Sequence, residues 1–248
     1  MIKLLEKGKR IDGRRFEDLR KVEISYEISK HAEGAARVKF GSTEVIVGVK
    51  LEVGKPFPDN PNEGTIIVGA EMLPLSSPDF ESGPPSVNSI ELARVVDRAI
   101  RESHAIDLEK LCIKEGEEVW MVLIDIYTIN DGGNLQDASA LAALAALKQA
   151  KFPSYDGKKI DYSKKTGKLP IASLPVECSV VRIKDKLLSD PCLDEEKMMD
   201  ARLTIGITEN NDICAMQKAG KGIFRFEDIS EMIEVSLKNS EKLRKLLK

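Results

Sequence analysis

Apolar and polar residues alternate along the chain from Val22 to Leu73, in segments that glycines separate. These segments read KVEISYEIS, AARVKF, TEVIVGVKLEV and GTIIVGAEML. A period of two residues is typical of strands with one buried face, so we predict consecutive strands here. The connecting segment GKPFPDNPNEG, residues 54–64, contains three prolines and two asparagines, which predicts an exposed loop.

Two helices are predicted in the middle of the chain. The first follows the Pro-, Gly- and Ser-rich segment SSPDFESGPPS, with Asn88 as its cap and Glu91 returning a bond to the cap, and it runs to about Ser103. The segment EEVWMVLIDIYTI then predicts a strand, and DGGN predicts a turn. The second helix, from about Gln136 to Ala150, is nearly all apolar and must be buried on most sides.

The last third of the chain repeats the strand pattern. Residues from Tyr155 to Lys168 are polar and rich in lysine, which predicts an exposed connection. Strand-like segments return after Ser173 in SLPVECSVVRIKDKLL, RLTIGITE and DICAMQ, and an amphipathic helix is predicted from about Phe226 to Leu247. The fold class is therefore α/β with mixed sheets, and no GxGxxG pattern supports a dinucleotide-binding fold.

Composition limits the possible functions. With 248 residues and 42% hydrophobic positions, the chain can build a large core as one domain or as two joined halves. The 38 basic and 41 acidic residues leave a net charge of -3, which gives no overall attraction for nucleic acid. Any site for a nucleic acid would therefore be a local patch.

The sequence predicts neither export nor a membrane span. The opening MIKLLEKGKR lacks the apolar region of a secretory signal, and the longest apolar stretch, Ala138 to Leu147, is shorter than the ~20 residues of a membrane span. We therefore expect a cytoplasmic protein without membrane association. The four cysteines have no CxxC spacing and read as small hydrophobic residues, and two histidines argue against a histidine-based triad or metal site.

The first predicted helix presents three arginines together. At 100° per residue, its apolar positions form one face, and the arginines form a narrow stripe on the opposite side. The apolar positions are Leu92, Val95, Val96, Ala99 and Ile100, and the arginines are Arg94, Arg98 and Arg101. Guanidinium groups in a row suit successive phosphates of a nucleic acid. The alternative is an ordinary solvated face with Asp97 and Glu102 as ion-pair partners, and both interpretations remain open.

Two further segments offer candidate chemistry. The DGGN turn before the second helix could present N–H groups to an anion, but a plain strand-to-helix turn is the favoured interpretation. Carboxylates of the run DPCLDEEKMMD, residues 190–200, could hold magnesium or act as a general acid. They alternate with Lys197 and Arg202, so a solvated loop is favoured for this segment.

Five motifs in order resemble the RNase PH superfamily across essentially the whole chain. They are GKRIDGRR, GAARVKFGSTEVIVGVK, NSIELARVVDRAIRES, DGGNLQDASALAALAAL and DPCLDEE. The details NSIELARVVDRAIR and DGGNLQDA resemble the non-catalytic, RNase PH-like ring subunit of the archaeal exosome. The resemblance implies an RNase PH fold, like domain 2 of ribosomal protein S5, with two pseudo-symmetric halves at residues 1–152 and 153–248.

Departures from the catalytic pattern of that family imply that the chain has no catalytic residues of its own. Catalytic relatives carry an arginine that grips phosphate just after the glycine turn, where this chain has Asn134 and Leu135. Two aspartates are expected around the late acidic segment, and Glu196 and Arg202 fall near them. A shift of the alignment by one or two residues brings Asp200 to the second position instead. The resemblance implies no metal site and no cofactor in this chain.

The resemblance also implies an assembly. Three heterodimers of this chain with a catalytic sister subunit would form a ring with RNA-binding cap proteins, and the sister would use phosphate, with magnesium as a further candidate, to degrade single-stranded RNA from 3′ to 5′. Arg94 and Arg98 are carried over as contacts to the RNA backbone, and Arg101 is a third candidate supported mainly by the helical wheel. The alternatives are a self-sufficient phosphorolytic exoribonuclease with a divergent site and a purely structural protein without an RNA role.

Overall fold

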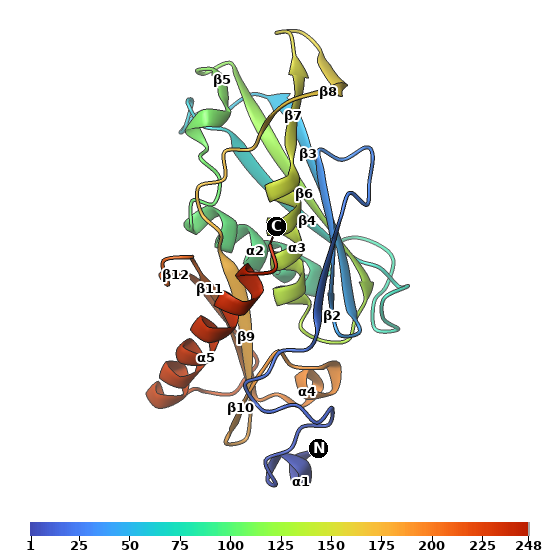
Figure 1. Ribbon diagram of the computed structural model, residues 1–248, viewed down its shortest axis with the longest axis vertical. Helices are drawn as coiled ribbons and strands as arrows, with labels where there is room; N and C mark the ends of the chain where they lie inside the picture. Colours follow the sequence, from blue (N-terminus) through green and yellow to red (C-terminus); the bar gives the residue numbers. More distant parts are fainter. Residues whose placement is uncertain (248) are drawn as a thin grey trace.

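Figure 1 shows the computed structural model, which describes residues 1–247, as an elongated molecule with two main sheets. The larger sheet has the strand order β1-β2-β3-β6-β4, and β5 also pairs with β6. Its strands are β1 Val22–Tyr26, β2 Gly34–Phe40, β3 Thr43–Gly54, β4 Thr65–Met72, β5 Cys112–Lys114 and β6 Glu118–Asn130. Only β4 and β6 run parallel to each other; the other pairs in this sheet are antiparallel.

The second main sheet is antiparallel and lies in the later part of the chain. Its order is β10-β9-β11-β12, and a separate hairpin pairs β7 with β8. These strands are β7 Lys151–Tyr155, β8 Ile160–Lys168, β9 Val176–Ile183, β10 Lys186–Ser189, β11 Ala201–Ile207 and β12 Ile213–Ala219.

Helix α3 joins the two sheets. It contacts β2 and β3 of the larger sheet and β9 of the second, and every residue from Asp137 to Leu147 in it is buried. Helix α2 packs on β4, α3 and β12, and α5 covers β9 and β11 (Figure 1). The helices are α1 Ile2–Leu5, α2 Val87–Glu102, the short 3-10 helix η1 Glu109–Leu111, α3 Leu135–Gln149, α4 Leu193–Met198 and α5 Phe226–Arg244.

The mixed α/β fold class is confirmed, as are the strands predicted from alternation and the buried apolar helix α3. The predicted cap of α2 was wrong. The helix begins at Val87, and the Ser86 hydroxyl accepts a hydrogen bond from the Ser89 N–H. Ser86 has extended backbone angles suited to a cap, whereas Asn88 already lies inside the first turn.

The lysine-rich segment, predicted to be an exposed connection, is largely exposed and contains a strand. Its residues form β8, because a turn at Asp156 reverses the chain: the Asp156 carboxylate accepts the N–H groups of Lys158 and Lys159. Lys165 of the same strand reaches the buried carboxylate of Glu33 at 2.9 Å. A turn and an ion pair therefore stabilise this strand, which its polar composition does not predict.

The first residues of the chain lie against the second sheet. Leu5 packs with Val181, Ile183 and Leu188 in one apolar cluster, and α1 lies near β10 at the lower end of Figure 1. The division at residues 152 and 153 stays a prediction. Within residues 1–247, no helix has the length and apolar character needed to cross a membrane.

Candidate nucleic-acid interface

Helix α2 buries its predicted apolar face and leaves Arg94 in solvent. Leu92, Val96 and Ile100 are almost fully buried. Arg94 is exposed and has no hydrogen bond or ion pair with any other described residue. Its guanidinium is therefore available to an outside anion.

Arg98 links α2 to the edge of the second sheet. It is half-buried, and it donates to the side-chain oxygen of Gln217 at 3.1 Å and to the Met216 carbonyl at 3.5 Å, both on β12. These contacts hold the Arg98 guanidinium in place against β12, one helical turn after Arg94. Five donors on a guanidinium leave others for a phosphate oxygen.

Arg101 is held within the chain. Its guanidinium pairs with Asp97 at 2.6 Å and donates to the Ile66 carbonyl on β4 at 3.0 Å. The alternative of a local ion pair thus describes Arg101 but not Arg94. The RNA contacts of all three arginines stay predictions.

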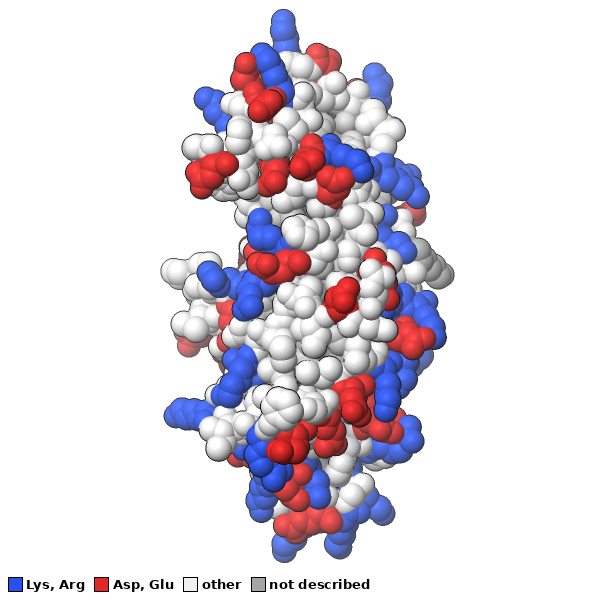
Figure 2. Space-filling view, turned by 90° about the vertical axis from the view of Figure 1, so that its left-hand side faces the viewer, with Lys and Arg blue, Asp and Glu red and all other residues white. Residues whose placement is uncertain are grey.

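The charge around these side chains is mixed. Figure 2 shows the face that carries β12 and α5, where acidic and basic side chains are interspersed and no large area has a single sign. This face therefore offers an anion individually placed guanidinium groups rather than a broad positive field.

The DGGN segment forms the strand-to-helix turn that was favoured. Asn134 has the left-handed φ of 59° at the start of α3, and the Gly133 N–H bonds the Asp131 carboxylate. Arg20 holds the turn by donating to the carbonyls of Gly132 at 2.9 Å and Gly133 at 3.0 Å.

The prediction of a solvated loop at residues 190–200 was wrong. Part of this segment forms α4, and Asp190 is fully buried. Its carboxylate lies 2.7 Å from the Arg20 guanidinium and 2.8 Å from the Asn134 amide. Burial opposes ionisation, yet the hydrogen bonds and charge of Arg20 hold the pKa of Asp190 below its usual value.

A second buried ion pair fixes α4. Arg10 lies 2.6 Å from Glu195, and both side chains are fully inaccessible. Arg10 also donates to the carbonyls of Ser189 and Asp190. The opening arginines therefore anchor the late acidic segment, a role that reasoning from the sequence missed. The sequence did contain a signal for this contact: the motif GKRIDGRR is basic and the motif DPCLDEE is acidic.

Asp137 forms a third buried polar site under the turn. Its carboxylate accepts the backbone N–H of Ser179 at 2.9 Å, the Ser179 hydroxyl at 2.7 Å and the Asn134 amide at 2.9 Å. Ser179 in turn bonds Thr204 at 2.8 Å. Burial raises the pKa of Asp137 to about 7 in spite of these donors.

Glu196 and Arg202 meet beside the start of α3. Arg202 lies 3.4 Å from Glu196 and 3.5 Å from Glu91, in the wall of a cavity of about 250 Å³. Burial raises the pKa of Glu196 although Arg202 opposes this. Asp200 lies elsewhere, exposed, and its carboxylate accepts the Lys184 N–H at 2.6 Å. Over residues 1–247 no three or more His, Cys, Asp or Glu side chains gather into a metal site.

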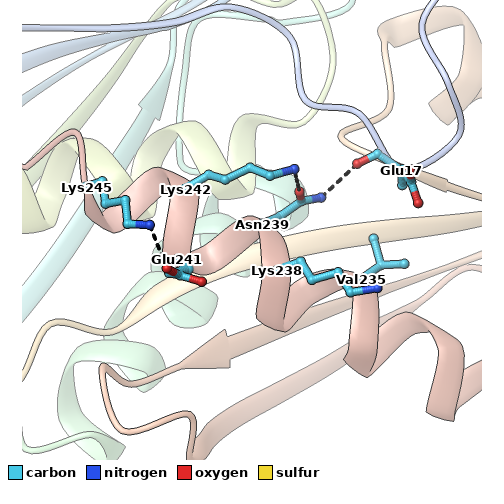
Figure 3. A pocket seen from close by; sticks show the side chains of 7 residues that line it. All are labelled: Glu17, Val235, Lys238, Asn239, Glu241, Lys242 and Lys245. Carbon is cyan, nitrogen blue, oxygen red and sulfur yellow. Dashed lines mark hydrogen bonds and ion pairs between the residues drawn. The ribbon is translucent and has the colours of Figure 1, made fainter.

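Another cavity, of about 420 Å³, lies along α5 between that helix and Glu17 (Figure 3). Its basic side chains are partly engaged: Lys245 pairs with Glu241 at 2.6 Å, and Lys242 bonds Asn239 at 3.0 Å. Asn239 also donates to the Glu17 carbonyl. This cavity therefore lies at the contact between α5 and the N-terminal segment that contains Glu17.

The sequence pattern of the 3′ exoribonuclease family matches the chain twice, with domain 1 over residues 18–153 and domain 2 over residues 173–239. The chain is 46% identical to "Exosome complex component Rrp42" of Thermococcus kodakarensis, over all of this chain and 93% of that protein. An Archaeoglobus fulgidus exosome structure with RNA bound to the active site is 47% identical, with a TM-score of 0.94 over all of this chain and 96% of the matched one. An archaeal exosome core structure is 44% identical, with a TM-score of 0.88 over 98% and 93% of the two chains.

Proposed function

The chain belongs to the 3′ exoribonuclease family, and from this premise we propose that it is a non-catalytic subunit of an exosome ring involved in 3′ to 5′ RNA degradation. It binds RNA and helps to structure the active site of a catalytic sister subunit. The full-length similarity to archaeal exosome components supports this assignment.

One observation carries the non-catalytic part of the proposal: the position just after the glycine turn, where catalytic relatives carry the arginine that holds phosphate, is occupied by Leu135. Asn134 is buried in contact with Asp190 and Asp137, and Leu135 is 7% exposed with an apolar side chain. Arg20 is committed to Asp190 and to the turn carbonyls. Phosphorolysis needs a phosphate dianion held beside the scissile bond, and losing such charge stabilisation costs at least ~10²-fold in rate.

The RNA-binding part rests on α2. Arg94 is exposed and unpaired among the described residues, and Gln217 holds the Arg98 guanidinium in place. One turn separates them, so they can meet successive phosphates of a single strand. Arg101 is a weaker third contact because Asp97 already neutralises it.

The proposal of a partner subunit is supported by exposed sheet edges and by the similarity to components of exosome complexes. β4 and β12 end their sheets, and they expose Ile67 at 48%, Ile213 at 41% and Met216 at 36%. Unpaired edges with apolar side chains favour cover by another subunit. We assign this cover to a catalytic sister subunit, in a ring of three heterodimers that RNA-binding cap proteins complete. The assembly would work in the cytoplasm, with phosphate and magnesium acting at the sister's site.

A decay assay tests the catalytic assignment. The purified chain is incubated with single-stranded RNA, phosphate and magnesium, alone and after co-expression with a catalytic sister. We expect nucleoside diphosphate release only with the sister. Robust, phosphate-dependent shortening of RNA by a preparation free of the sister would support the alternative of a self-sufficient exoribonuclease and overturn the proposal.

A further inference from the structure

The carboxylate of Glu196 lies at the start of α3, beside the glycine turn. It lines the same cavity as Leu135 and Gln136 in the first turn of that helix, and the Glu196 side chain is 17% exposed. The first N–H groups of a helix lack partners within the helix and carry partial positive charge, so they hold anions such as phosphate. Here the anion at this position is a side chain of the protein itself.

A second, independent feature of the same cavity is an unsatisfied guanidinium. Arg202 is only 9% exposed, and its Nε has no hydrogen-bond partner among the described residues. Its contacts to Glu196 at 3.4 Å and Glu91 at 3.5 Å are longer than the ~2.7–2.9 Å of strong charge-assisted bonds. A buried guanidinium with a free donor is suited to bind an oxyanion with several acceptor oxygens.

Glu196 is held in this place by the seating of α4 on the turn. The Leu193 N–H bonds the Gly132 carbonyl at 3.0 Å. Gly133 lies so close to α4 that a Cβ there would be 2.5 Å from the Cys192 carbonyl carbon and 2.8 Å from the Pro191 oxygen. These contacts keep the backbone of α4, and with it Glu196, beside the turn.

The charges that line the cavity disfavour a second anion. Glu91, Asp131 and Glu196 contribute carboxylates, and Arg202 is the one basic residue in the wall. Repulsion between like charges grows as their separation falls, and burial strengthens it. An inorganic phosphate that entered would meet three carboxylates around one guanidinium.

We propose that Glu196 is an internal substitute for phosphate, which fills the oxyanion position at the start of α3 and keeps free phosphate out of it. Without this carboxylate, the N-terminus of α3 and the Arg202 guanidinium form a latent site for a tetrahedral oxyanion. The inference deepens the proposed function and rests on it, because it explains why the cavity beside the glycine turn of this chain does not hold phosphate.

The test is a binding measurement on the full chain alone, so that no sister site contributes. Inorganic phosphate is titrated by calorimetry into wild type, Glu196→Gln and Asp194→Asn. Asp194 is exposed on the same helix, so its change removes the same charge away from the cavity. We expect Glu196→Gln to bind phosphate about 10- to 100-fold more tightly than the other two, the range of a hydrogen bond to a charged group.

A second variant identifies the site. Adding Arg202→Gln to Glu196→Gln should abolish the gain, because the guanidinium would be gone. Equal phosphate affinity in wild type and in folded Glu196→Gln would overturn the inference, and so would a gain of the same size in Asp194→Asn. If Glu196→Gln does not fold, Glu196→Ala replaces it in the same titration, and the same gain in phosphate affinity is expected. RNA shortening by the isolated wild type would sink the proposed function by a different readout.

Discussion

The guanidinium of Arg101 lies 2.6 Å from the carboxylate of Asp97, one turn back on α2. Arg94, on the same stripe, has no such partner among the described residues. The helical wheel treats these arginines as equivalent, and the structure separates them. A paired guanidinium must give up or share its carboxylate before it meets a phosphate, so the contributions of the stripe to RNA binding should be unequal.

We therefore expect the double change of Arg94 and Arg98 to alanine to lower the affinity of the assembled ring for single-stranded RNA of any sequence. Removing a guanidinium that binds a phosphate should flatten the log–log salt dependence by ~0.7 units. Arg101→Ala alone should change affinity much less. Fluorescence anisotropy over a series of salt concentrations measures both quantities, and decay by the ring should slow in parallel.

Lys238→Ala is the control, because Lys238 is exposed on α5 and has no ion pair or hydrogen bond among the described residues. Folding should survive in all variants, since exposed changes alter stability by less than about 0.5 kcal/mol and the Arg98 bonds to β12 add about 1 kcal/mol. A double variant with wild-type affinity and salt slope would show that α2 does not contact RNA.

A stable ring with the catalytic sister is the second expectation. Permanent interfaces commonly bury more than ~2,000 Å² in total, and β4 and β12 offer unpaired edges with exposed apolar side chains. Native mass measurement after co-expression should give equal numbers of the two chains, with three of each in the complex. A soluble monomer that does not associate with the sister would contradict this.

Local patterns in the sequence predict most of the fold. Alternation identifies β1 to β4, and the apolar run of α3 predicts the burial of Asp137 to Leu147. These features depend on neighbouring residues, and neighbours are visible in one sequence. The hairpin strand β8 was not predicted, because its stability comes from a turn and from an ion pair with Glu33, not from an apolar face.

The polar interior could not be predicted in the same way. Arg10 and Glu195 are 185 positions apart, and Arg20 and Asp190 are 170 apart. Nothing in one sequence indicates which of many basic residues meets which acid across such distances. Exposed charge is the usual state of Asp and Glu, so charge pattern favoured a solvated loop where the chain buries Asp190.

Gly133→Ala should strongly destabilise the protein. The residue has a φ of +90°, and a Cβ would meet Leu193 N as well as Cys192 and Pro191 backbone atoms. The matched control is Gly13→Ala, whose φ is +80° but whose Cβ would meet nothing within 4 Å. The control should cost about 1–2 kcal/mol, the penalty of a left-handed side chain, and Gly133→Ala clearly more. Urea unfolding measures both, and equal losses would show that α4 does not press on the turn.

The last prediction concerns the buried carboxyl of Asp137, whose pKa burial raises to about 7 from an ordinary 3.8. Between these values the folded protein keeps a proton that the unfolded chain has released. The stabilisation from this group is therefore fully present below pH ~4, falls as pH rises by up to about 1.4 kcal/mol per unit, and is lost above pH ~7. The protonated oxygen can donate to the Ser179 hydroxyl, which in turn can donate to Thr204.

An asparagine at position 137 can copy that neutral form. Its amide nitrogen would donate to the Ser179 hydroxyl, and its oxygen would accept from the Ser179 N–H and from Asn134, as one carboxylate oxygen does now. We expect Asp137→Asn to fold and to lose less stability than wild type between pH 5 and pH 8. Urea unfolding of both proteins at these two values gives the difference. Asp137→Ala, which leaves the Ser179 and Asn134 donors buried without an acceptor, should be destabilised at both values. Parallel pH profiles for wild type and Asp137→Asn would mean that Asp137 is ionised in the folded protein throughout this range.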